Sequence, residues 1–113
     1  MPTDDGYPTP KELKTIKTWS SEDIIEKPGK LVEFIGSIWW QSGWGFSYKK
    51  GRNSLFHKTV WKLELHTGGW SGNEDIIDTL QHTFFWFFYW QKSTRGGHYW
   101  FEIPIRKKDK QNE

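Results

Sequence analysis

The sequence predicts an α+β domain, in which a four-stranded antiparallel sheet of two hairpins carries N-terminal helices and one inter-hairpin helix on one face. Three observations indicate this class. Apolar residues recur at helical spacing up to about residue 40, and they alternate with polar residues in most of the chain that follows. Rings supply the core, because nine Trp, eight Phe and four Tyr stand in a chain whose apolar fraction is only 35%.

Two capped helices are expected first. Thr9 and Glu12 form a capping box with Pro10 at the first helical position, which predicts a helix from Pro10 to about Trp19. Ser20, three residues before an Asp, predicts a second short helix that Pro28 ends.

A third helix is expected from Gly29. Its apolar residues follow the i, i+3, i+4, i+7, i+8 pattern of a stripe laid on a core. They are Leu31, Phe34, Ile35, Ile38 and Trp39.

The first hairpin follows. Trp44, Phe46 and Tyr48 alternate with small and polar residues, which predicts a half-buried strand. A turn is expected over residues 50–53, and alternation over residues 55–66 predicts the second strand.

The second half of the chain is expected to be a helix and a hairpin. Ser71 and Glu74 suggest another capping box, before a helix that ends near residue 82. Residues 84–90, FFWFFYW, carry a ring at every position, which predicts an interior strand covered on both faces. Residues 95–97 form a turn, and the last strand ends at Pro104.

Length and composition predict one domain over residues 9–105, with flexible ends at residues 1–8 and 106–113. The absence of Cys excludes disulfide frameworks, zinc fingers and thiol nucleophiles. The first ten residues lack the basic and apolar regions of a signal peptide, and no segment is apolar enough to span a membrane. We therefore expect a cytoplasmic protein with no membrane partner.

The segment TGGWSGNE is the first candidate binding site. A glycine-rich link into a helix presents free backbone N–H groups, and its Trp can stack on a planar ligand or anchor a partner. The segment matches neither nucleotide-loop motif, and in the plainer alternative its residues only make a turn, a cap and part of the core. The expected ligand-binding residues are Gly68, Gly69, Trp70, Ser71, Gly72, Asn73, Trp100 and Arg95.

The open face of the sheet is the second candidate. Rings of residues 84–90, with Trp100 or Trp44, would form a platform for stacking bases, flanked by basic hairpin tips. The tip residues are Lys49, Lys50, Arg52, Lys92 and Arg95. The alternatives are a homodimer seam or a face covered by the N-terminal helices. A net charge of +2 is weak for a duplex-DNA binder, and charge alone argues neither for nor against nucleic acid. Rings flanked by cations suit single-stranded nucleic acid or a nucleotide, while the small charge favours a protein partner over a nucleotide.

An enzyme is the less favoured interpretation. A small hydrolase or nuclease would use His66, His98 and Glu74. The two histidines could form a cross-strand pair or supply a general base, with Glu64, Glu74 or Glu102 as the orienting acid. However, no histidine pair has metal-ligand spacing and no serine lies in a GxSxG turn. We therefore assign no catalytic residue, metal ligand or cofactor.

The segments TGGWSGNE and RGGHYWFE resemble those of small phage and prophage proteins, in which a capped helix, a GWG strand and a GGWSGNE loop occur in this order. The resemblance covers about residues 9–103 and implies a viral origin and the host cytoplasm, with no particular chemistry. The leading interpretation is a phage-type accessory protein that binds a host protein or a nucleotide-like ligand stoichiometrically. The alternative is a structural protein that acts through homo-oligomer contacts.

Overall fold

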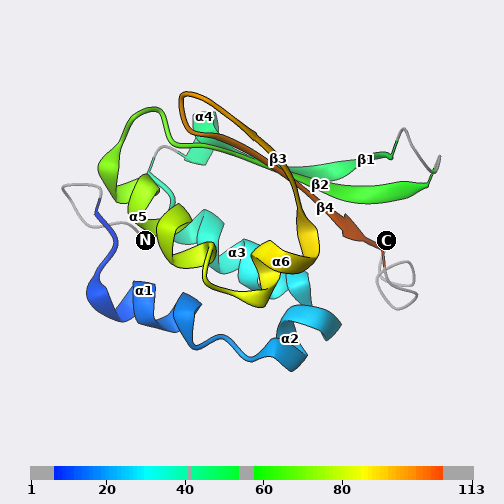
Figure 1. The fold of residues 1–113 in the computed structure, drawn as a ribbon, viewed down its shortest axis with the longest axis horizontal. Helices are drawn as coiled ribbons and strands as arrows, with labels where there is room; N and C mark the ends of the chain where they lie inside the picture. The colour runs from blue at the N-terminus through cyan, green and yellow to red at the C-terminus, as the bar shows by residue number, and fades with distance from the viewer. Residues whose placement is uncertain (1–6, 41, 54–57, 106–113) are drawn as a thin grey trace.

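The chain folds into one antiparallel sheet with strand order β1-β2-β4-β3 and helices on one of its faces (Figure 1). The computed structural model describes residues 7–40, 42–53 and 58–105. The helices are α1 Pro10–Lys17, α2 Ser21–Glu26, α3 Pro28–Ile38, α4 Ser42–Gly45, α5 Ser71–Leu80 and α6 Phe84–Tyr89. The strands are β1 Phe46–Arg52, β2 Thr59–His66, β3 Trp90–Thr94 and β4 His98–Pro104. The predicted α+β class is confirmed.

The N-terminal caps are those that the sequence predicts. The Glu12 N–H donates to Thr9 Oγ1 at 3.1 Å, and the Thr9 N–H donates to Glu12 Oε1 at 2.8 Å. Ser20 caps α2 by accepting from the Asp23 N–H at 3.1 Å. Tyr7 and Pro8, expected in the flexible terminus, contact the domain, since Pro8 is buried and Tyr7 packs beside Trp70.

The first hairpin differs from the prediction at both of its ends. Trp44 lies in the helical turn α4, so β1 begins at Phe46. The predicted turn at residues 50–53 is wrong, because Lys50 pairs with Trp61 and Arg52 with Thr59. Residues 55–57 of the predicted second strand lie outside the described residues.

The predicted interior strand over residues 84–90 is also wrong. The segment forms α6, and β3 begins only at Trp90, so two helices connect the hairpins instead of one. Phe85 and Tyr89, four residues apart, are buried, whereas Phe87 and Phe88 are exposed. A helix with one buried face explains this pattern, because residues four apart lie on the same side. A strand covered on both faces would bury all four rings.

Apart from the short α4, which directly precedes β1, the helices form two levels beneath the sheet (Figure 1). Helices α3, α5 and α6 lie next to the sheet, while α1 packs outside α5 and α2 outside α3 and α6. The core between sheet and helices contains Ile35, Leu63, Leu80, Phe85 and Phe101, all fully buried or nearly so. Among the described residues, no helix has the length and apolar character needed to cross a membrane.

Candidate binding surfaces

The TGGWSGNE loop joins β2 to α5 and is fixed to the second hairpin. Gly68 and Gly69 have φ of +64° and +75°, so the chain reverses where other residues would be strained. The Thr67 N–H donates to the Gly97 carbonyl at 2.9 Å. Gly97 has φ of +82°, and a Cβ there would overlap the Thr67 hydroxyl. The loop is therefore a junction between the two halves of the sheet.

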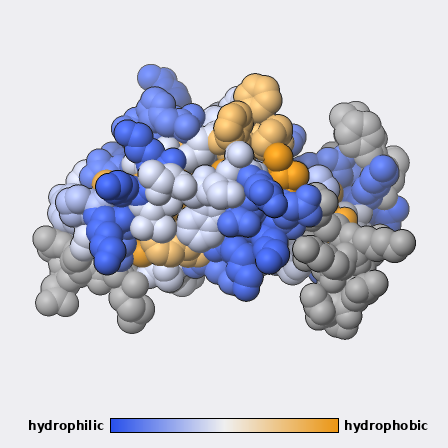
Figure 2. All heavy atoms as spheres, turned by 90° about the horizontal axis from the view of Figure 1, so that it is seen from below, coloured by the Kyte–Doolittle hydropathy of each residue, from blue (hydrophilic) through white to orange (hydrophobic). Residues whose placement is uncertain are grey.

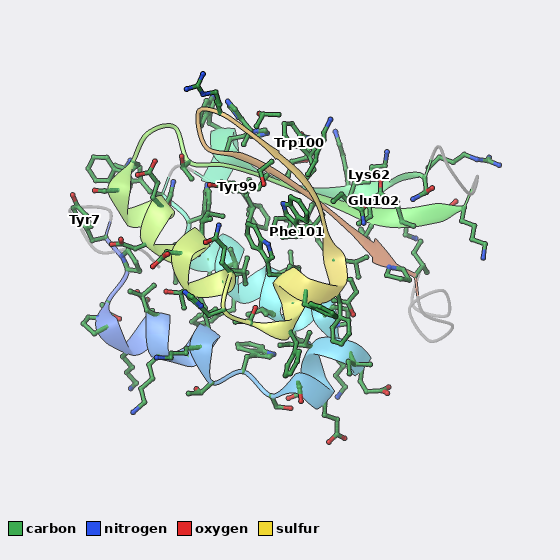
Figure 3. All side chains as sticks on the ribbon, in the orientation of Figure 1. Tyr7, Lys62, Tyr99, Trp100, Phe101 and Glu102 are labelled. Atoms are coloured by element: carbon green, nitrogen blue, oxygen red, sulfur yellow. The ribbon has the colours of Figure 1, made fainter. Side chains whose placement is uncertain are left out.

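Trp70 uses its ring within the fold. It stacks on Trp40 with 5.5 Å between centroids and 25° between planes, and Tyr7 lies 5.4 Å away. The Tyr7 and Ser71 hydroxyls share a 2.9 Å hydrogen bond, and Figure 3 shows Tyr7 beside the start of α5. Trp70 thus anchors the N-terminal segment, and this geometry favours the plainer interpretation of the loop.

Asn73 hydrogen-bonds the loop to the backbone of Trp40. Its side chain is only 2% exposed. It accepts from the Trp40 N–H at 2.9 Å and donates to the Trp40 carbonyl at 3.2 Å.

The predicted capping box of Ser71 and Glu74 is wrong, because Trp70 is the N-cap of α5 and no side chain caps it. Gly72 is buried as well, so the candidate residues in this loop serve the fold first.

The face of the sheet away from the helices carries polar and aromatic residues, and we call it the open sheet face. Alternation turns Phe101 toward the helices and Trp100 away from them, as Figure 3 shows. Registered pairs across β2 and β4 lie on it side by side. The pairs are His66 with His98, Glu64 with Trp100 and Lys62 with Glu102.

Two histidines meet at one end of this face. His66 Nδ1 and His98 Nδ1 are 2.7 Å apart, and His66 Nε2 lies 3.4 Å from Glu64 Oε1. Of the three acids expected as orienting partners, Glu64 is the one beside the histidines, whereas Glu74 lies in the first turn of α5. The described residues contain no group of three His, Cys, Asp or Glu that could hold a metal ion.

Aromatic rings and cations continue along the open sheet face. The edge of His66 meets Trp44, at 6.4 Å, and Trp100, at 5.8 Å, while Lys92 Nζ lies 4.6 Å over the Trp100 ring. Trp44 is 63% exposed. Arg95 is exposed at the tip of the β3-β4 hairpin.

A second surface was not found from the sequence. Phe84, Phe87 and Phe88 of α6 are exposed, as is Ile25 of α2, and we call these four residues the α6 patch. Figure 2 shows a prominent cluster of apolar side chains at the upper edge of this view, in addition to a smaller apolar area lower on the same face. The uniform run of rings in residues 84–90 concealed it, because the run has no periodicity from which to assign an exposed face.

No family model, curated protein or solved structure matches this chain. The resemblance to phage proteins therefore stays a prediction, and the case for a function rests on the two surfaces.

Proposed function

We propose that the protein is a non-catalytic binding protein that docks a partner protein on the α6 patch. The observation that carries the proposal is the exposure of Phe87, which is 81% exposed on a helix whose other side is buried. Apolar patches rimmed by polar residues mark interaction sites, and burial of each Phe contributes roughly 1.5–3 kcal/mol.

The patch is held in place before any partner arrives. The Tyr89 hydroxyl donates to the Ile24 carbonyl at 3.1 Å, which ties α6 to α2. The Phe85 ring packs 5.5 Å from Phe101 of the sheet. Since α6 is anchored on two sides, docking would cost little conformational entropy.

The exposed rings also contact one another. Phe84 stacks on Phe88 at 6.0 Å, and Phe87 meets Phe88 edge-on at 5.6 Å. A cluster of ordered rings resembles the aromatic centres that dominate the binding energy of protein interfaces.

Charge suggests the character of the partner. Helix α2, which supplies Ile25, has the sequence SEDIIE and carries three acids and no base. A partner that offers an apolar groove with a basic rim would complement both the rings and this charge. In a phage-type protein, that partner would be a host protein.

The test is a comparison of three baits in a bacterial host extract: wild type, Phe87→Ala, and Trp44→Ala as a matched exposed-ring control. We expect a partner that wild type and Trp44→Ala retain and Phe87→Ala loses. With the purified partner, calorimetry should show binding at least about 30-fold weaker for Phe87→Ala, equivalent to about 2 kcal/mol. Equal retention by all three baits would refute the proposal.

A second copy of the chain is the competing occupant. Light scattering coupled to size exclusion, over a range of protein concentrations, distinguishes the two. A stable dimer in wild type that becomes a monomer in Phe87→Ala would make the patch a homodimer seam and would overturn the partner-protein proposal.

A further inference from the structure

We propose that the open sheet face binds single-stranded nucleic acid. Charge is distributed unevenly between the sheet layer and the helical layer. The sheet and its turns, residues 46–53, 58–66 and 90–104, hold seven Lys and Arg against two Glu, a net charge of +5. The helical layer, residues 7–40 and 70–89, holds five Lys against eight acids, a net charge of −3. This count covers both faces of the sheet. Alternation places Lys49, Lys62 and Lys92 on the open sheet face together with Glu64 and Glu102, and it turns Lys50 and Arg52 to the other face. The small net charge of the chain therefore hides a basic sheet layer and an acidic helical layer.

The cations are spread across the open sheet face on three strands. Lys49 of β1 lies directly opposite Lys62 of β2, so both point to the same side. The Lys62 stem lies close over Gly51, which leaves room for it. Lys92 of β3 reaches over Trp100. Lys62 also lies opposite Glu102 on its other side, which offsets part of the repulsion between Lys49 and Lys62, and an anionic ligand that follows the strands would relieve the rest.

The two acids on this face have partners within the sheet. Glu102 Oε1 accepts from the Asn53 side-chain amide. Glu64 Oε1 faces His66 Nε2. These contacts fix the positions of the two carboxylates but leave their charge, so the face carries three Lys against two Glu.

Rings lie between the cations. Trp44, His66 and Trp100 follow one another with centroid distances of 6.4 Å and 5.8 Å, and His98 lies alongside. Exposed aromatic rings inside a basic surface are the combination that holds single strands, since each base can stack on a ring while the phosphates meet cations.

The same geometry argues against two related ligands, a nucleic-acid duplex and a mononucleotide. A duplex hides the faces of its bases, so the exposed Trp44 ring would contribute nothing to it. A mononucleotide would need cations that converge on one phosphate, whereas β4 separates Lys92 of β3 from the neighbouring pair Lys49 and Lys62.

The experiment uses the full chain and fluorescence anisotropy of labelled 15-nucleotide dT and rU oligonucleotides, with a 15-base-pair duplex for comparison. We expect saturable binding to the single strands at 50 mM salt and clearly weaker binding to the duplex. With three to five phosphate contacts, affinity should fall on the order of 20- to 100-fold between 50 and 200 mM salt.

Variants localise the site. Trp44→Ala should weaken binding about 5- to 100-fold through lost stacking. Lys92→Gln should weaken binding and make the salt dependence shallower by about 0.7 in the logarithmic slope. The matched controls are Phe87→Ala, an exposed ring on the α6 patch, and Lys11→Gln, an exposed Lys of α1. Both variants should bind the oligonucleotides as tightly as wild type does. Because Phe87→Ala is expected to lose the protein partner, this result also distinguishes nucleic-acid binding from the proposed function.

Three results would overturn the inference. They are no binding to either oligonucleotide at 50 mM salt, a duplex bound as tightly as the single strands, or equal losses from Lys92→Gln and Lys11→Gln. Lys92→Gln keeps the inference falsifiable if Trp44→Ala disturbs the fold, because Lys92 is an exposed side chain.

Discussion

Single side chains decide what the TGGWSGNE loop does. The sequence predicts correctly that the loop joins a strand to a helix and that its glycines make a turn. It does not reveal that Asn73 turns inward, because the partner groups on Trp40 lie 33 residues earlier in the chain. A separation of 30 residues likewise lies between Trp70 and the Trp40 ring on which it stacks. Local composition therefore indicates a binding loop, and tertiary contacts give most of its side chains a structural role.

Asn73→Ala tests that role. The change leaves the N–H and carbonyl of Trp40 without their side-chain partner in a partly buried place. We expect the free energy of unfolding to fall by about 2–3 kcal/mol, measured by urea denaturation. Ser71→Ala, which removes only an exposed hydrogen bond to Tyr7, is the control and should stay within about 0.5 kcal/mol of wild type. An Asn73→Ala protein as stable as this control would contradict the assignment.

Whole elements were predictable where their signals are local. The capping box of Thr9 and Glu12 and the apolar stripe of α3 predict their helices because caps and periodicity are properties of adjacent residues. The prediction for residues 84–90 was wrong because their local signal is ambiguous. Seven consecutive rings fit a buried strand and an amphipathic turn of helix equally well. The exposed half of α6 is what makes the α6 patch, so the missed element and the missed surface have one cause.

The pair Phe85→Ala and Phe87→Ala tests the helical arrangement of α6. Phe85 is fully buried against Phe101, so its truncation should destabilise the fold by about 3–5 kcal/mol. Phe87 is exposed, and its truncation should change stability by no more than about 0.5 kcal/mol. Thermal and urea unfolding followed by circular dichroism measure both. Similar large losses from the two variants would support the interior strand instead.

At the scale of the whole molecule, the sheet separates two chemically different sides. The helical layer is acidic and carries the α6 patch, whereas the sheet layer is basic and its open face carries Trp44 and Trp100. Neither proposed surface covers the other, so a protein partner and a nucleic acid would not compete for space. Composition alone averages these sides into a net charge of +2, and only the topology reveals the division.

Both sides depend on the central pairing of β2 with β4, which joins the two hairpins and ends at the contact of Thr67 with Gly97. Gly97→Ala should destabilise the molecule more than Gly69→Ala, although both glycines have positive φ. At Gly69 a new Cβ meets nothing within 4 Å, so the change should cost only the backbone strain of about 1 kcal/mol. At Gly97 the same strain is joined by overlap with the Thr67 hydroxyl, and we expect a total of about 3 kcal/mol or more by urea denaturation. Equal losses of stability in the two variants would contradict this role of the contact between Thr67 and Gly97. The contact would then not explain how Trp44 and His98 are positioned on the open sheet face.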